Sequence, residues 1–163
     1  MEIKMALHLP RDAASVPVTR RVLDRCLETL GVTPDTRADI ALALSEACAN
    51  VVQHAGPGEE YQVQVSARNR RCVIEVVNAG SRTGTVQGGR GTGRERLGGN
   101  AFASGPVPAT AERGRGLKII HAVADNMQLT GNERHGTTVH FEKTLQWLPG
   151  AAGQYLFNAD GDS

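Results

Sequence analysis

The chain of 163 residues carries almost no excess of charge and has no long apolar run. Its 18 lysines and arginines stand against 17 aspartates and glutamates, which leaves a formal net charge of +1. That balance excludes the broad basic field that attracts nucleic acid, so we expect no direct nucleic-acid partner. Glu2 and Lys4 interrupt the N-terminus where a signal peptide would be apolar. We therefore expect no membrane contact, a soluble protein and a cytoplasmic location.

Cysteine is also scarce. Cys26, Cys48 and Cys72 are odd in number, lack the spacing of metal ligands and lie within apolar stretches. We expect all three to be small buried hydrophobic residues, which fits a reducing compartment. The length suits one domain, which we place at residues 1–145, followed by a loosely attached C-terminal tail at 146–163.

The first half of the chain predicts one strand and two helices. Alternating residues before Pro10 indicate a half-buried strand. A helix should follow from Ser15, its expected cap, to Gly31. Its expected apolar stripe consists of Val18, Val22, Leu23, Cys26 and Leu30. A second helix should start after Thr33 and run to about Gln53 or His54, where glycine and proline stop it.

The second half predicts a hairpin, a long loop, a helix and two strands. Residues 61–66 and 72–77 read as paired strands around a polar turn at 68–71. The stretch 81–113 is rich in glycine and arginine, has no sustained period, and reads as a long flexible lid. A helix should follow from Gly116 to about Met127, and alternation at Val139 and Phe141 marks the last strand.

This order of elements favours a two-layer α+β sandwich. The hairpins indicate a mixed, largely antiparallel sheet, and the helices are too few to cover both of its faces. We therefore expect the helices on one face.

Two polar residues in the second predicted helix are candidates for chemistry. Glu46 and Asn50 are four residues apart, so they project from the same side of the helix, one turn apart. They fall on the flank of an apolar stripe, at its rim. A carboxylate and an amide in this arrangement could share a magnesium-bound phosphate; the alternative is a solvated glutamate beside a boundary asparagine.

Three further segments carry candidate binding residues. Gly114, Arg115, Gly116 and Leu117 would open a helix, where free amides and the helix dipole suit a phosphate, or would form a simple hinge. Arg113 and Arg115 could add charge or be solvated. Asn78 and Gly80 end a buried strand, where a side chain could meet a nucleobase or only form a turn. Thr137, at the start of the last strand, could place a hydroxyl beside the same pocket.

The ordered set of these motifs resembles the ATP-binding Bergerat fold shared by gyrase, mismatch-repair ATPases, histidine kinases and a heat-shock chaperone, the GHKL family. The closer resemblance is to the RsbW-like anti-sigma factor serine/threonine kinases of bacterial stress and sporulation control. LSEACANVVQHA is similar to that family's N-box, ERGRGLKII to its second glycine box and GTTVHFEK to its closing strand. The resemblance spans roughly residues 13–144 and implies ATP, Mg²⁺ and often a homodimer.

The resemblance also implies a role for each candidate. Glu46 matches the general base and Asn50 the magnesium ligand, roles that suit a carboxylate and a neutral amide oxygen. Gly114, Gly116 and Leu117 match the phosphate-side glycine box, and Arg113 matches an arginine that some members present to the terminal phosphate. Thr137 matches the adenine-side threonine. His54 matches a histidine common in the family, or is simply a helix-end residue.

One departure concerns the first glycine box. The family has Asp-x-Gly-x-Gly there, whereas this chain has Asn78, Ala79, Gly80, Ser81 and Arg82, so the charged acceptor for adenine and the second glycine are missing. A neutral hydrogen bond is weaker than a charge-assisted one by about 1 kcal/mol, or several-fold in affinity. We therefore expect ATP binding that is weaker than is usual in the family.

The resemblance implies a regulator that binds a sigma factor and phosphorylates a small STAS-domain anti-anti-sigma protein. An alternative is a non-catalytic module that acts by protein contact, with ATP binding relaxed or lost at Asn78. A histidine kinase fragment is a third class, but the chain lacks a phosphoacceptor dimerisation domain and a sensor segment.

Overall fold

The computed structural model describes residues 1–54, 60–79, 111–132 and 136–158. Its strands are β1 (Glu2–Pro10), β2 (Glu60–Arg68), β3 (Arg71–Ala79), β4 (Asn126–Asn132) and β5 (Gly136–Thr144). Its helices are α1 (Ser15–Leu30), α2 (Pro34–His54), α3 (Ala111–Val123) and α4 (Ala152–Asn158). Most of the predicted lid, at 81–110, lies outside the described residues, and its last three residues belong to α3.

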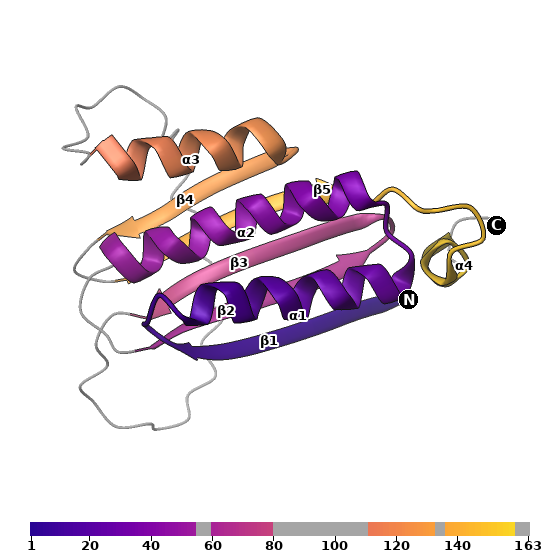
Figure 1. Cartoon of the computed structure of the whole chain (residues 1–163), viewed down its shortest axis with the longest axis horizontal. Helices are drawn as coiled ribbons and strands as arrows, with labels where there is room; N and C mark the ends of the chain where they lie inside the picture. Colours follow the sequence, from indigo (N-terminus) through magenta and orange to yellow (C-terminus); the bar gives the residue numbers. More distant parts are fainter. Residues whose placement is uncertain (55–59, 80–110, 133–135, 159–163) are drawn as a thin grey trace, which may run out of the picture.

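The described strands form a sheet in the order β1-β2-β3-β5-β4, with antiparallel neighbours throughout. Helices α1, α2 and α3 lie side by side across one face of this sheet (Figure 1). The predicted two-layer sandwich is therefore confirmed, and within the described strands the sheet is wholly antiparallel.

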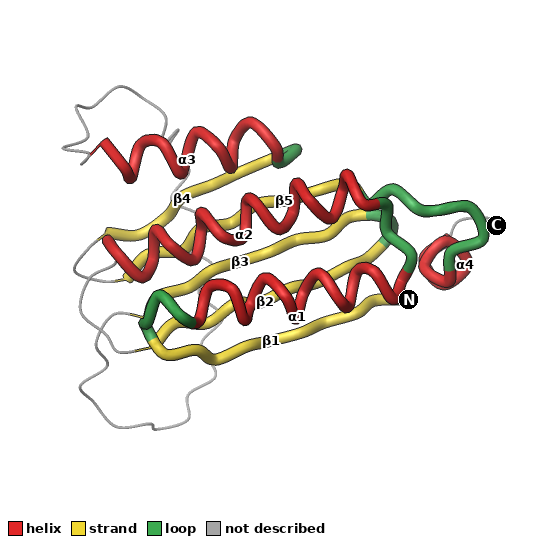
Figure 2. Tube along the Cα trace, in the orientation of Figure 1, coloured by secondary structure: helices red, strands yellow, loops and turns green. Residues whose placement is uncertain are grey.

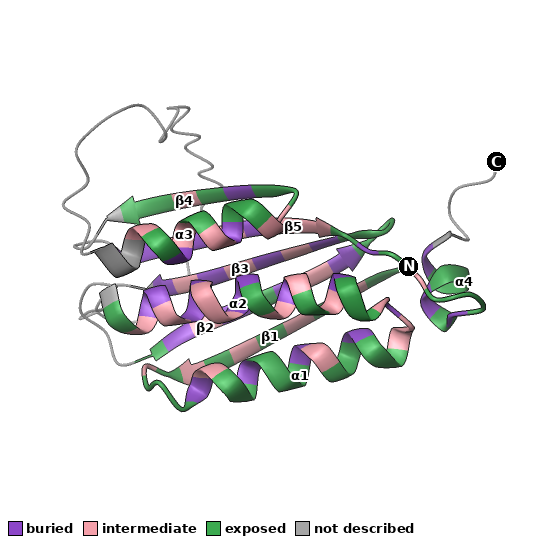
Figure 3. Cartoon of the chain, turned by 45° about the horizontal axis from the view of Figure 1, so that its top comes forward, coloured by how far each residue is buried: buried purple, intermediate pink, exposed green. Residues whose placement is uncertain are grey.

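Alternation along the strands fixes which face carries the helices. In β3, Cys72, Ile74 and Val76 have no exposed surface, and Val139 and Phe141 of β5 are equally buried. Because successive side chains of a strand point to opposite faces, these residues form the core under the helices. Figure 3 shows buried residues along the central strands β2 and β3, beneath the helices. The predicted hairpin β2–β3 is present, and Asn69 and Arg70 at its turn both have positive φ, as a two-residue turn between paired strands requires.

Helix α1 buries only part of the expected stripe: Leu23 is buried and Leu30 is half-buried against the core. Its buried residues are Ser15, Thr19, Leu23 and Leu27. By contrast Val18 and Val22 are exposed, and so is Cys26, so the expectation that all three cysteines are buried was wrong for Cys26. The small polar residues tolerate burial because their hydroxyls are satisfied. The Thr19 hydroxyl donates to the Ser15 carbonyl at 2.9 Å.

The ends of α1 also follow local rules. Ser15 is not the cap, because Ala14 occupies the N-cap position without a side-chain bond, and the Ser15 hydroxyl instead donates to the Asp12 carbonyl at 2.6 Å. At the other end Gly31 has φ 82°, and its amide donates to the Glu28 carbonyl. This left-handed ending suits glycine, which has no side chain to clash.

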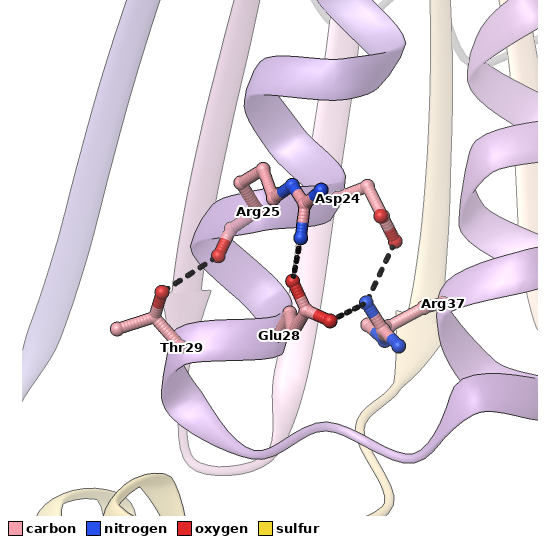
Figure 4. A network of polar contacts seen from close by, with 5 residues as sticks. All are labelled: Asp24, Arg25, Glu28, Thr29 and Arg37. Atoms are coloured by element: carbon pink, nitrogen blue, oxygen red, sulfur yellow. Dashed lines mark hydrogen bonds and ion pairs between the residues drawn. The ribbon is translucent and has the colours of Figure 1, made fainter.

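An ion-pair network joins α1 to α2. Arg37 lies 3.2 Å from Asp24 and 3.4 Å from Glu28, and Glu28 also pairs with Arg25 at 2.6 Å (Figure 4). The Arg37 side chain is only 17% exposed, whereas its partners are more accessible. These contacts hold the start of α2 against the second half of α1.

Residues 147–158, the described part of the segment after Gln146, are not the loosely attached tail that the sequence suggested. Val32 and Trp147 form an isolated β-bridge, and the Trp147 ring stacks on Phe157 of α4 with centroids 5.6 Å apart. Phe157 is 3% exposed and belongs to the core. This segment therefore packs beyond the C-terminal end of α1. It lies at the end of the sandwich away from the C-terminal ends of β3 and α2 (Figure 2).

Two further details follow from the element bounds. Met127 was expected in the helix after Gly116, but that helix ends at Val123. Met127 is instead a buried residue of β4. None of the described helices is long and apolar enough to cross a bilayer.

Candidate functional site

Four chain segments converge at one end of the sandwich, on the left in Figure 1. They are the C-terminal half of α2, the start of α3, the end of β3 and the start of β5. All of the candidate residues predicted from the sequence and described by the structure lie on these four segments. The motifs are therefore neighbours in space as well as ordered in the sequence.

Helix α2 places Glu46 and Asn50 as predicted, with one difference. The stripe of Ile40, Leu44, Ala47, Cys48 and Val51 is buried, with exposures of 0 to 1%. Glu46 is half-buried at the rim of that stripe, but Asn50 is only 6% exposed and lies inside the rim. Among the described residues, the Asn50 Oδ1 atom has no hydrogen-bond partner although it is fully buried. A buried amide oxygen without a donor suits a cation or another ligand that supplies the missing contact.

Gly116 of α3 lies directly against Glu46. A Cβ atom placed on Gly116 would lie 2.8 Å from the Glu46 Oε2 atom, closer than real Cβ contacts allow. Only glycine at this position leaves the carboxylate where it is. The N-box and the second glycine box are therefore in contact across the α2–α3 interface, as their resemblance to known motifs requires.

The start of α3 differs from the prediction. The helix begins at Ala111, not at Gly114, because Ala111, Glu112 and Arg113 are good helix formers that extend it toward the N-terminus. Only the first four amides of a helix lack an intrahelical acceptor. Counted from the position before Ala111, these four amides end at residue 113, so Gly114 already lies in the hydrogen-bonded part of the helix. Gly116 contributes its lack of a side chain instead.

Asn78 and Thr137 face each other across β3 and β5. They are register partners, and their side chains are 1% and 3% exposed. Both share the strand parity of the core residues, so they project toward the helix layer. Among the described residues, Thr137 Oγ1 has no hydrogen-bond partner. A second polar atom without a partner is therefore buried at this end of the sheet.

The other predicted residues have varied outcomes. Gly80 lies outside the described residues, as do the side chains of Arg113 and His54. Arg115 is exposed, and Leu117 is half-buried and packs on the core. In the described ranges no group of three or more His, Cys, Asp or Glu residues could hold a metal ion. A cation here would depend on Asn50 and on oxygens that a ligand brings with it.

The sequence did not predict a buried polar cluster that joins α1, α2 and β2. The Tyr61 hydroxyl lies 2.6 Å from the Ser15 Oγ atom, and Tyr61 also contacts Cys48. Burial raises the pKa of the Cys48 thiol to about 12, so the thiol stays neutral. Because Cys48 faces this cluster, the opposite flank of α2, with Glu46, is turned toward α3. The paired Ser15 and Thr19, four residues apart, were the signal that could have revealed it.

Comparison with known proteins agrees with this geometry. The model of the histidine kinase-like ATPase domain family matches residues 9–143. Serine-protein kinases RsbW of Bacillus cereus (strain AH820) and Bacillus mycoides (strain KBAB4) are 29% and 28% identical over 145 residues, covering 88% of this chain and 86% of each relative.

A solved structure shows the same fold. The crystal structure of the RsbU and RsbW domains of Rv1364c from Mycobacterium tuberculosis superposes with a TM-score of 0.61 at 17% identity. The match covers 88% of this chain and 32% of that longer one. With the family model spanning most of the sequence, the chain belongs to the histidine kinase-like ATPase domain family.

Proposed function

We propose that this protein is an ATP-dependent anti-sigma factor that binds a sigma factor and phosphorylates a serine or threonine of a STAS-domain antagonist. The observation that carries the proposal is the contact between Gly116 and Glu46, which places the candidate base beside the candidate phosphate-binding helix. The RsbW serine-protein kinases, which match over most of their length, support the same reaction class. We also propose that it acts in the cytoplasm.

The described residues divide the work of the reaction. Glu46, at the rim, would accept the proton of the incoming hydroxyl and hold that hydroxyl in line with the terminal phosphate. Asn50 Oδ1 would hold Mg²⁺, whose charge offsets that of the phosphates. The first turn of α3, which precedes Gly114, would receive phosphate oxygens. Asn78 and Thr137 would face the base, and Arg113 and Arg115 would add positive charge near the phosphates.

Replacing Glu46 tests the proposal. Glu46→Ala should keep Mg-ATP binding but lose phosphoryl transfer to a STAS-domain protein by at least about 100-fold, as general-base loss typically does. Asp35→Ala is a matched control, because it removes a carboxylate from the first turn of the same helix, away from the site. Full transfer by Glu46→Ala, measured with radiolabelled ATP, would exclude this residue as the base.

A second candidate function rests on Asn78. An asparagine where the family has an acidic residue favours a module that acts by protein contact without nucleotide. Titration calorimetry with Mg-ATP separates the two functions. No binding at millimolar nucleotide would favour the contact-only module, whereas saturable binding favours the kinase.

A homodimer is part of the proposal. Within the described sheet β1 is an edge strand, so its outer side presents backbone groups that a second copy could pair with. Light scattering coupled to gel filtration should give twice the chain mass of 17.3 kDa. A monomer at micromolar concentration would rule out this mode of assembly.

A further inference from the structure

The corner between β1 and α1, residues 10–15, is a compact turn held by its own hydrogen bonds. The Asp12 carbonyl accepts from the Ser15 amide at 3.0 Å and from the Ser15 hydroxyl at 2.6 Å. The Asp12 carboxylate accepts from the Ala14 amide at 2.7 Å, and the Asp12 amide donates to the Pro10 carbonyl at 2.8 Å. Figure 1 shows this corner at the end of the sandwich where α2 also ends. The corner therefore lies beside the half of α2 that carries the candidate base and magnesium ligand.

The corner contacts α2 first through Arg11. The Arg11 Nε atom donates to the Val52 carbonyl at 3.3 Å, a bond between residues 41 positions apart. Val52 is in the last turn of α2, where the final carbonyls have no amide partner within the helix and the helix dipole favours a cation. In an α-helix the amide of residue 54 bonds the carbonyl of Asn50. A contact that holds the last turn therefore also holds the backbone of Asn50.

The second contact runs through the hydroxyl of Tyr61, a residue of β2 that is 2% exposed. The Tyr61 hydroxyl lies 2.6 Å from Ser15 Oγ. Because the one proton of the Ser15 hydroxyl goes to the Asp12 carbonyl, Tyr61 is the donor in this pair. The Tyr61 oxygen keeps its lone pairs for the buried Cys48 thiol that it contacts on α2. A continuous polar chain therefore links the corner to α2.

Cys48 lies on the side of α2 away from the candidate site. At about 100° per residue, Glu46 and Asn50 are each about 200° around the helix from Cys48. A rotation of α2 by roughly 10° would move a side-chain tip that lies about 6 Å from the helix axis by about 1 Å. A misplacement of about 1 Å can lower a rate by about 100-fold. A contact at Cys48 therefore influences where the Glu46 carboxylate lies against Gly116.

We propose that the corner is a clamp on the C-terminal half of α2, and that Arg11 and Tyr61 are positioning residues for Glu46 and Asn50. Arg11 fixes the end of the helix, and Tyr61 fixes its rotation about its own axis. Neither residue lies in the three motifs that carry the family resemblance, so those motifs do not predict the clamp. The inference rests on the proposed kinase function and extends it to residues outside the site.

Hydrogen exchange of the full chain tests the clamp without any assay of activity. In Tyr61→Phe and in Arg11→Met, the amides of residues 50–54 should exchange at least about tenfold faster than in the wild type, because the last turns open more easily. The amides of residues 40–44, in the same helix, should change by less than about threefold. Equal acceleration of both sets would show a general loss of stability and would overturn the clamp, as would no acceleration of either.

The second tyrosine provides a matched control. Tyr155→Phe removes the same hydroxyl group from a side chain that is 70% exposed on α4, away from the corner. It should leave the exchange of both sets of amides unchanged. If the Tyr61→Phe protein does not fold, Ser15→Ala takes its place, because it interrupts the same polar chain at the next residue.

Phosphoryl transfer tests the positioning roles. With saturating Mg-ATP and a STAS-domain substrate, at a temperature where each variant is folded, Tyr61→Phe and Arg11→Met should slow single-turnover transfer by at least about tenfold. Ser15→Ala should give a loss similar to that of Tyr61→Phe, and the double variant should be no slower, because both changes break one chain. Unchanged rates in the folded variants would overturn the positioning roles, since a residue that only adds stability does not alter the rate of folded protein.

The outcomes separate this inference from the proposed function. A wild-type protein that transfers no phosphate would remove the kinase assignment, and the exchange pattern would then decide the clamp on its own. Transfer by the wild type, with uniform exchange in the variants, would overturn only the inference.

Discussion

Substituting Gly116 by alanine tests whether the approach of α3 to Glu46 controls catalysis. The new Cβ would lie 2.8 Å from Glu46 Oε2, whereas ordinary contacts begin at 3.4 Å, so the oxygen must move by 3.4 − 2.8 = 0.6 Å or more. The carboxylate is the far end of a flexible side chain and can move without disturbing the core. Alanine also favours a helix over glycine by about 0.5 to 1 kcal/mol. We therefore expect an unchanged or slightly raised melting temperature.

Phosphoryl transfer should respond much more strongly. A misplacement of about 1 Å can lower a rate by about 100-fold, so a displaced Glu46 should slow single-turnover transfer by roughly 10- to 100-fold. The assay follows label transfer from saturating Mg-ATP to a STAS-domain substrate, with nucleotide affinity measured separately. Because the step is taken at saturation, a weaker Kd for ATP alone would not reproduce the loss.

A double-mutant cycle identifies the route of the effect. If the new methyl group acts through the carboxylate, Gly116→Ala should change the transfer rate by less than about threefold in a Glu46→Ala background. Losses that multiply in the double variant would refute this reasoning, as would full activity of Gly116→Ala. A fall in melting temperature would show instead that the contact is structural.

Three other predictions concern stability and accessibility. Gly153→Ala would place a Cβ 2.2 Å from the Trp147 ring, so α4 should undock and the fluorescence of the single tryptophan should shift toward that of a solvated indole. Cys26 should react with a thiol reagent in the native protein, whereas the two buried thiols, whose pKa burial raises to about 12, should react only after unfolding. The Thr144 amide donates to the Asp125 carboxylate at 2.6 Å and lowers the pKa of that carboxyl below its ordinary value of 3.8. The ionised carboxylate therefore stabilises the fold at pH values above 3.8, and this stabilisation is lost as the pH falls through the pKa of the folded state. Urea unfolding should show Asp125→Asn to be less stable than wild type at neutral pH and equal to it in strong acid.

Local patterns predicted the elements that carry the site. The helix from Pro34 to His54 and the hairpin of β2 and β3 are present because their periodicities and stop signals are strong and local. The joint position of Glu46 and Gly116 was not predictable from spacing. It depends on the packing of α2 against α3, which only the ordered resemblance to known motifs suggested.

Two of the failures, at Ser15 and at Trp147, share a cause in long-range contacts. Ser15 was expected to cap α1, yet its hydroxyl is held beside Tyr61, 46 residues away. The segment at Trp147 was predicted to be a tail because local periodicity does not reveal its contacts. These are the β-bridge between Trp147 and Val32 and the stacking of Trp147 on Phe157. Tertiary contacts of this kind override the preferences of a short segment.

The position of the single tryptophan has a practical optical consequence. Trp147 follows the far end of β5, whereas Thr137 lies near the start of that strand, so the natural fluorophore and the candidate nucleotide site are at opposite ends of the described structure. Its emission should report melting of the C-terminal segment and stay silent when a nucleotide binds. A signal for occupancy has to be introduced with a fluorescent nucleotide, and its change can then be followed in the same sample independently of unfolding.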